Sequence, residues 1–362
     1  MKRIFNSPTP LSLALQGGGA HGAFTWGVLD RLLEDGRFDI AAISGTSAGA
    51  INAVALTHGW LEGGRDGARA ALQRLWQAVG ASLPAHAVKA GPDDTPAFAP
   101  HARAWMQWAR WWSPQQLNPF GLNPLREVLH AQIDFERVRG AQAPQLFIAA
   151  THANSGRLRL FGNAELSVDV VMASACLPSL QAAVVIDGEP YWDGGYSANP
   201  ALFPLVRSGI PDLLIVWLSP LSYEQVPQEV EAIRERALEF AFNATFLREA
   251  RLLSELCEMA QPASWPLSAL RWLGGLHAFG RLERRLLRLR THVIDAHDDL
   301  AGLPQETRMM AHGPFLERLR NQGRERAARW LADAAPLVGR ASSADLGALF
   351  AAPAGPTARL AG

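Results

Sequence analysis

Short apolar runs alternate along the chain with longer stretches in which apolar residues recur every three or four positions. Runs of the first kind are typical of buried strands, and stretches of the second kind are typical of helices with one apolar face. The alternation predicts a layered α/β protein. The predicted strands are residues 11–16, 41–44, 146–151, 157–161, 183–186, 213–218 and 291–295.

A long insertion, at about residues 58–140, separates the second predicted strand from the third. A helix is predicted within it at residues 67–79, and a stretch rich in proline and glycine at 91–100 indicates a mobile loop. Beyond about residue 220 the pattern becomes mostly helical, with predicted helices at 229–259, 278–289 and 313–334.

The first chemical signal is the sequence GTSAG at residues 45–49, in which a serine lies between two glycines. Flanking glycines permit a sharp strand-to-helix turn that lifts the serine hydroxyl out of the sheet. An apolar run precedes the motif and small residues follow it, so Ser47 is expected at a helix start, where backbone amides favour negative charge. The pattern predicts a nucleophile, although an ordinary turn has the same letters.

A second glycine motif, GGGAHG at residues 17–22, follows the first predicted strand. Gly17, Gly18 and Gly19 have no side chains, so their backbone N–H groups are exposed. Such groups, fixed in advance, stabilise the oxyanion that forms when serine attacks an ester, by about 3 kcal/mol per donor. A phosphate-binding loop is the alternative, but the spacing matches neither common phosphate motif and no lysine follows.

The third element is the sequence YWDGGY at residues 191–196, where a strand end leads into a double-glycine turn. Asp193 could approach Ser47 from this turn and act as its base. A plain Asp-Gly turn after a strand is the alternative interpretation.

These three motifs, in this order, resemble the patatin-like phospholipase family, whose members are serine lipid acyl hydrolases. The resemblance is strong from about residue 10 to 207 and looser to about 335, and it includes NPL at 123–125 and ASACLP at 173–178. It implies a three-layer α/β/α fold with a mainly parallel central sheet and a helical C-terminal extension. The implied divisions are 10–207 for the catalytic core, 208–340 for the helical part and 341–362 for a flexible tail.

The mechanism implied by the resemblance is a Ser-Asp dyad without histidine and without a cofactor. Asp193 would accept the proton of Ser47, an acyl-enzyme would form, and water would release the fatty acid. An ordinary carboxylate, with a pKa of about 4, is a weak base toward serine, so this mechanism needs close geometry and strong oxyanion stabilisation. The family usually has arginine or lysine where this chain has His21, which is expected to cap the loop or orient substrate.

Other catalytic arrangements remain open at this stage. His297 follows a predicted strand and gives the order Ser47, Asp193, His297 of an α/β-hydrolase triad. In that fold, however, the nucleophile normally lies several strands into the sheet, and His297 also fits a polar loop. His152 is a further candidate base. A non-lipid carboxylesterase or thioesterase, or a catalytically silent scaffold, would be compatible with the same motifs.

Four tryptophans lie within residues 105–112. On a helix, Trp105, Trp108 and Trp112 share one face. Tryptophan prefers interfaces between dry and wet regions, so this face is a candidate for contact with a bilayer or an acyl chain, with Arg103 and Arg110 near lipid phosphates. Packing against the protein's own body is the alternative. A basic run at residues 281–290 has the same two interpretations, anionic lipid or a solvated helix face.

Composition narrows the classes of partner. The chain has 48% hydrophobic residues and equal numbers of basic and acidic side chains, 34 of each, so nothing indicates nucleic-acid binding. Two cysteines, Cys176 and Cys257, argue against a disulfide-stapled secreted domain, and no metal-ligand cluster is evident. Since no run of about 18 apolar residues occurs and the amino terminus is too broken for a signal peptide, we expect a cytoplasmic protein, peripheral to a membrane at most. The oligomeric state is left open.

Overall fold

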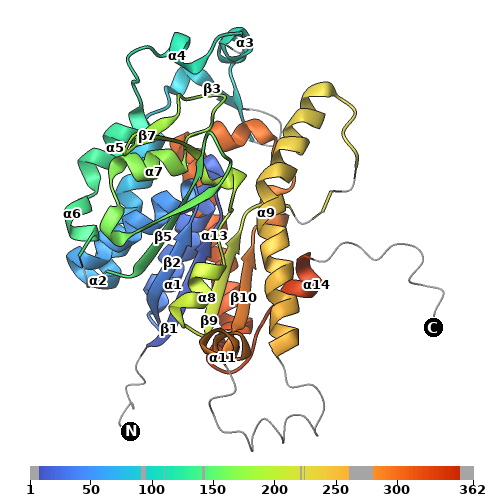
Figure 1. Cartoon of the computed structure of the whole chain (residues 1–362). Coiled ribbons are helices and arrows are strands. Elements are labelled where there is room, and N and C mark those ends of the chain that lie inside the picture. Colours follow the sequence, from blue (N-terminus) through green and yellow to red (C-terminus); the bar gives the residue numbers. More distant parts are fainter. Residues whose placement is uncertain are drawn as a thin grey trace, which may run out of the picture.

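The computed structural model describes residues 8–90, 95–109, 111–140, 143–220, 222–223, 225–260 and 280–350. Its centre is a sheet with the strand order β10-β9-β1-β2-β5-β8-β7, and β6 pairs with β5 (Figure 1). The strands of this sheet are β1 (Thr9–Leu15), β2 (Phe38–Gly45), β5 (Gln145–His152), β6 (Leu158–Gly162), β7 (Val184–Ile186), β8 (Glu189–Asp193), β9 (Asp212–Trp217) and β10 (Arg290–Asp295).

The five strands from β10 to β5 run parallel, and the antiparallel pairs are confined to β6, β7 and β8. Every predicted strand is present within a few residues of its predicted limits. The mainly parallel sheet expected from the sequence is therefore confirmed.

Helices cover both faces of this sheet. The first face carries α1 (Gly22–Asp35), α2 (Ala48–Ala81), α5 (Pro124–Gln132), α6 (Phe135–Val138), α7 (Val168–Ser174), α12 (His297–Leu300) and α13 (Gly313–Asp333). The second face carries α8 (Phe203–Ser208), α9 (Val230–Ala260), α11 (Arg281–Arg288) and α14 (Leu346–Phe350).

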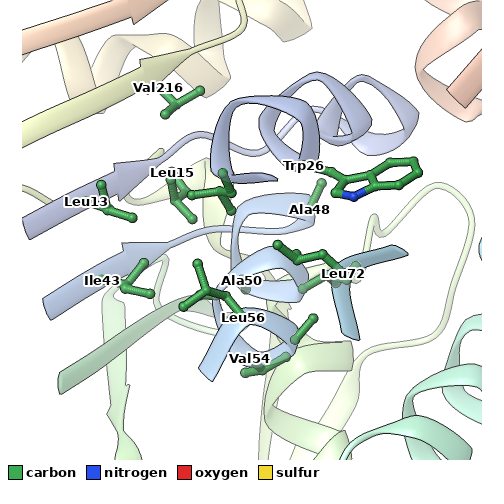
Figure 2. Packing of buried hydrophobic residues seen from close by; sticks show 14 of the residues in the cluster. Leu13, Leu15, Trp26, Ile43, Ala48, Ala50, Val54, Leu56, Leu72 and Val216 are labelled. Carbon is green, nitrogen blue, oxygen red and sulfur yellow. The ribbon is translucent and has the colours of Figure 1, made fainter. Parts of the chain in front are cut away.

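The alternation of side chains along β9 shows why the core divides in two. Leu214 and Val216 belong to the larger apolar cluster, whereas Leu213, Ile215 and Trp217 belong to the smaller cluster on the other face. Successive side chains of a strand point to opposite faces, so an unbroken apolar run predicts a strand buried on both sides. Figure 2 shows the larger cluster, with strand residues packed against side chains from α1 and α2. The three-layer arrangement is thus confirmed.

The C-terminal part of the chain packs closely on the first helix. A Cβ atom added at Gly27 would lie 1.9 Å from the carbonyl oxygen of Arg320, and one at Gly323 would lie 2.1 Å from that of Phe24. The two glycines therefore let the α1 and α13 backbones touch. Buried Asp30 of α1 also pairs with Arg324 of α13. These contacts join the helical C-terminal region to the core.

The insertion differs in detail from the prediction. The predicted helix at 67–79 is the second half of α2, which bends at Gly63 and Gly64, where the backbone is not helical. A short hairpin that the pattern does not predict follows, made of β3 (Val88–Ala90) and β4 (Pro96–Phe98), and then come α3 (Pro100–Ala109) and α4 (Pro114–Leu117). Residues 91–94 of the predicted mobile loop lie outside the described residues.

The prediction of a flexible tail from residue 341 is wrong for its first part. Residues 346–350 form α14, and the side chains of Leu346 and Phe350 are buried with α9 and Trp217 in the second apolar cluster. Burial of these two apolar side chains stabilises a short helix in a segment that otherwise consists mostly of small residues. Residues 351–362 lie outside the described part of the chain.

Short 3-10 helices complete the described elements. They are η1 (Gly19–His21), η2 (Ala85–Ala87), η4 (Asn163–Glu165), η5 (Gly194–Tyr196), η6 (Gln305–Met309) and η7 (Ala335–Leu337). Among the described residues, no helix is both long and apolar enough to cross a membrane.

Candidate active site

Ser47 lies at the sharp turn between β2 and α2. Its backbone has φ 53° and ψ −121°, a conformation that is rare for a residue with a side chain. The flanking glycines are required by close packing, since a Cβ at Gly45 would lie 2.6 Å from the carbonyl oxygen of Gly49, and one at Gly49 would lie 2.1 Å from that of Leu15. Strain of this kind is characteristic of a nucleophile elbow. The turn leaves Ser47 only half-buried, so its hydroxyl can meet a substrate.

The glycine loop that follows β1 lies directly against this serine. A Cβ on Gly17 would be 2.8 Å from the Cβ of Ser47, so only glycine fits there. The Gly17 N–H donates to the Asn199 side-chain oxygen at 2.8 Å and is already in use. Within the described part of the chain, the N–H groups of Gly18 and Gly19 have no acceptor. Of the three expected oxyanion donors, two are therefore available in this structure and the third holds the loop in place.

Strand β5 brings the third motif to the same place. Gly45 of β2 pairs with Ile148, and Asp193 of β8 pairs with Ala150, two residues farther along β5. Strand β6 occupies the opposite edge of β5, because its pairing overlaps that of both β2 and β8. Hence β2 and β8 share one edge, and β8 begins to pair where β2 has ended. Asp193 is thereby placed beside the turn that carries Ser47.

Asp193 is 1% exposed, and its backbone is fixed on both sides. Its N–H donates to the Cys176 carbonyl at 2.8 Å, and its carbonyl accepts from the Thr151 hydroxyl at 2.8 Å. Its carboxylate accepts from the Gly195 N–H at 2.7 Å and interacts with the Ser47 side chain. Burial raises the pKa of Asp193 to about 7, although the bonds from Gly195 and Ser47 act in the opposite direction. The aspartate is therefore a stronger base than an ordinary carboxylate.

A family model described as patatin-like phospholipase matches residues 13–206, which is more than half of the chain. The protein belongs to the patatin-like phospholipase family. The matched segment contains the glycine loop, the serine elbow and the aspartate turn.

Two solved structures are similar to this patatin-like chain. One, from Legionella pneumophila, is VipD, with 16% identity, a TM-score of 0.41, and coverage of 90% of this chain and 67% of that one. The other is full-length ExoU with SpcU, from the type III secretion system of Pseudomonas aeruginosa, with 17% identity, a TM-score of 0.27, and coverage of 84% and 71%. Both TM-scores lie below 0.5, so these likenesses add nothing to the assignment. A search of curated proteins finds no match.

Two side chains of this patatin-like site were not singled out from the sequence. The Ser174 hydroxyl, at the end of α7, accepts the Ser47 N–H at 3.0 Å, and Asn199 holds the Gly17 N–H. Both side chains are buried. Ser174 lies in one of the segments that carry the family resemblance, which was a usable signal. Nothing local marks Asn199, which is 182 residues from its partner.

His21 is buried behind the glycine loop. Its Nε2 lies 2.8 Å from the Thr307 hydroxyl, which itself donates to the Pro304 carbonyl at 2.6 Å, so the histidine is the donor. Burial and the nearby charge of Arg308 hold the pKa of His21 well below its usual range, and the ring is neutral. In this position the His21 side chain ties the loop to η6 and makes no capping bond to α1.

The other candidate bases lie elsewhere. His297 follows β10, which is three strand positions from β2, or roughly 14 Å. This separation argues against a triad through His297. His152 is engaged at the surface, with Nε2 2.7 Å from a Glu189 oxygen. The Cys176 thiol donates to the Ala182 carbonyl at 3.1 Å, and burial raises its pKa to about 11, so it is not a reactive thiolate.

The tryptophan segment is exposed. Trp105, Trp108 and Trp112 are 59%, 54% and 46% exposed, and the rings of Trp108 and Trp112 lie 5.5 Å apart. Packing of this face against the protein's own body, the alternative considered from the sequence, is therefore wrong. Trp112 lies in the turn beyond α3, and Arg110 lies outside the described residues. In Figure 1, α3 and α4 lie above the carboxyl ends of β1 and β2, at the end of the sheet where Ser47 is placed.

Proposed function

We propose that this protein is a serine lipid acyl hydrolase in which Ser47 is the nucleophile and Asp193 the base. The main support for the proposal is that β2 and β8 both pair with the same edge of β5, the first ending at the serine turn and the second at the aspartate. The pKa of Asp193, raised to about 7 by burial, supports the same roles. It removes the main objection to an aspartate base, which is its weakness at neutral pH.

In the first step, the Ser47 oxygen attacks the ester carbonyl carbon and its proton moves to the Asp193 carboxylate. The oxyanion that forms is stabilised by the N–H groups of Gly18 and Gly19. Collapse of this intermediate expels the alcohol, which takes the proton from Asp193, and leaves an acyl-serine. Water then attacks the acyl carbon and gives a proton to Asp193. That proton returns to Ser47 as the fatty acid is released.

Lipid is the proposed substrate for two reasons. The family to which the chain belongs is described as phospholipases. In addition, exposed tryptophans are suited to a membrane surface, because the indole ring has an apolar body and a polar N–H. We propose that Trp105, Trp108 and Trp112 contact the bilayer surface while a phospholipid acyl ester reaches Ser47. A soluble ester or thioester would not need this segment.

The test is a phospholipid panel in vesicles, with released fatty acids measured by mass spectrometry. Wild-type protein is expected to release fatty acid, and Ser47→Ala is expected to release none while remaining folded. Ser82→Ala, an exposed serine at the other end of α2, is the matched control and should behave as wild type.

Labelling with a fluorophosphonate probe separates the alternatives. Labelling at Ser47 with no lipid hydrolysis would favour a non-lipid esterase or thioesterase. Absence of both labelling and hydrolysis would identify a catalytically silent scaffold and overturn the proposal.

A further inference from the structure

One face of helix α9 contacts both halves of the candidate site. Phe242 and Asn243 lie three and four residues after Glu239, and Phe246 lies four and three residues after them, so all four project from one side of the helix. Phe242 lies against the Asp193 turn, since a Cβ on Gly195 would be 2.1 Å from its ring. The two polar members of the face, Glu239 and Asn243, reach toward the glycine loop. Helix α9 follows the family-matched segment in the sequence and carries none of the three motifs.

Glu239 is the charged member of this face, and its side chain is 2% exposed. Its carboxylate accepts from Arg308 at 2.8 Å, from Gln305 at 2.5 Å, and from the Tyr223 hydroxyl. Arg308 and Gln305 both belong to η6. A buried carboxylate with several donors holds them firmly, because each would otherwise leave a buried polar group unpaired. Glu239 therefore fixes η6 against α9.

The segment η6 in turn forms the wall behind the glycine loop. Gly19 has φ +59°, and a Cβ there would lie 2.2 Å from the Arg308 carbonyl oxygen. One residue earlier, the Thr307 hydroxyl accepts the hydrogen bond from His21. The peptide that presents the Gly19 N–H is thus in contact with the backbone of the residue whose side chain Glu239 binds.

A second link runs from Asn243, one turn farther along α9, to the residue before the loop. The Gln16 amide nitrogen donates to the Asn243 side-chain oxygen at 3.0 Å. The Gln16 side-chain oxygen accepts the Ser219 N–H at 3.0 Å. Gln16 and Asn243 are both buried. The glycine loop is therefore held from α9 at its beginning and at its end.

We propose that Glu239 is a positioning residue for the oxyanion donors, acting through Arg308 and η6 on Gly19. This inference rests on the proposed function, since it assigns a part in that reaction to a residue that touches no reacting atom. If the contact serves only stability, its loss will lower the melting temperature without changing turnover per active site. If it positions the donors, its loss will lower kcat while KM stays nearly constant, because the donors act mainly on the transition state.

The experiment compares Glu239→Gln with Glu255→Gln in the full chain, using a soluble nitrophenyl ester and active-site titration with a fluorophosphonate. Glu255 is on the same helix, but it is exposed and pairs with Arg251 at 2.9 Å. We expect Glu239→Gln to lower kcat per titrated site roughly 10- to 100-fold, less than the loss of a whole oxyanion donor. KM should change less than about 2-fold, and Glu255→Gln should match wild type.

Arg308→Gln breaks the same pair from its less buried side and tests the proposal even if Glu239→Gln fails to fold. It should lower kcat to a similar extent, and the double variant should be no slower than either single variant. Normal kcat per titrated site in Arg308→Gln, or in a folded Glu239→Gln, would overturn the inference alone. Wild-type protein without Ser47-dependent hydrolysis would overturn the proposed function and this inference together.

Discussion

Two buried aspartates lie at opposite ends of the sheet and have opposite electrostatic surroundings. Asp193 ends β8 beside Ser47, and no cation contacts it among the described residues. Asp212 begins β9 at the other end, where it accepts from Arg290 at 2.8 and 2.9 Å, from His292 at 3.2 Å and from the Gly339 N–H at 2.9 Å. Each residue is 1% exposed. Equal burial thus accompanies two different sets of partners.

The pKa values diverge accordingly. Burial raises the pKa of Asp193 to about 7, because a carboxylate in an apolar site loses its hydration. Burial acts in the same direction on Asp212, but the bonds from His292 and Arg290 outweigh it and lower the pKa of Asp212 well below its ordinary value. A buried carboxylate paired with a cation is held in its charged form, whereas one without a cation can take up a proton near neutral pH. The difference supports the proposed role of Asp193 as a base, and we expect Asp212 to contribute to stability.

The largest expected effect is that of Asp193→Asn on turnover. Removal of the base should lower kcat on a soluble nitrophenyl ester about 10³-fold, while the protein remains folded, because an amide can still accept the Gly195 N–H. His297→Ala should lose little activity. If His297→Ala is as damaging as Asp193→Asn, a triad replaces the dyad. Asp193 would then not be the base, and its raised pKa would not distinguish it from Asp212 in function.

Asp212→Asn should show the reverse behaviour. Loss of this carboxylate leaves Arg290 without its partner and should lower the free energy of unfolding by about 3 kcal/mol, with kcat unchanged. Urea denaturation at neutral pH measures the first quantity and ester hydrolysis the second. A variant of wild-type stability would show that the Asp212 cluster is not an anchor.

The pH dependence of activity follows from the raised pKa of Asp193. The ionised carboxylate is the active form, so kcat/KM should fall about tenfold per pH unit below pH 7 and level off above it. The profile is measured from about pH 5 to 9 on a soluble ester. A profile that is flat down to about pH 5 would place the pKa of the base at an ordinary carboxylate value.

Stability should respond to pH with opposite signs at the two ends. In the unfolded chain Asp193 releases its proton near pH 4, but in the folded chain it keeps it up to about pH 7. The native state binds more protons between these values, so the free energy of unfolding falls by roughly 4 kcal/mol as pH rises from 4 to 7. Asp193→Asn should remove this fall. For Asp212 the folded pKa is lowered, so its contribution is present above about pH 4 and is lost as pH decreases.

The smallest expected effect is on hydrolysis, and it comes from changes to exposed side chains at the two ends of the sheet. Substitution of Trp105, Trp108 and Trp112 by alanine should lower hydrolysis of vesicle phospholipid about tenfold and hydrolysis of a soluble ester less than twofold. The basic run of α11 lies at the Asp212 end of the sheet, away from α3 (Figure 1), so we expect it to be a solvated helix face and not a lipid contact. The matched control is therefore Arg284→Gln with Arg288→Gln, two exposed arginines of α11, and it should affect neither substrate. Equal losses on both substrates in the tryptophan variant would assign that segment a structural role.

The parts of the site that the sequence predicted depend on local constraints. Ser47 needs glycines on both sides because its turn leaves no room for Cβ atoms, and such a requirement is visible in five consecutive letters. The strands were also predicted from local sequence, because a strand buried on both faces needs an unbroken apolar run. The short strands β3 and β4 were missed because three residues give no usable periodicity, and β4 starts with a proline.

The remaining features depend on contacts between distant residues. Nothing near Asn199 indicates that it will bind the Gly17 N–H, and nothing near Glu239 indicates that it will bind Arg308. The tryptophan segment illustrates a different limit. An apolar helix face has the same pattern whether its partner is the protein or a lipid, so only the folded arrangement decided against packing.

The ladder along β5 makes the separation of Ser47 and Asp193 a discrete quantity. A slip of one residue in the β5–β8 pairing would turn the aspartate to the opposite face of the sheet, and a slip of two would move it by almost 7 Å. No intermediate positions exist. The tip of the β5–β6 hairpin can therefore gain or lose residues without altering the distance between the two groups. The Ala153 N–H still donates to Pro190 of β8, so the exposed residues 154–156 are the suitable place to insert a tag or a reporter sequence.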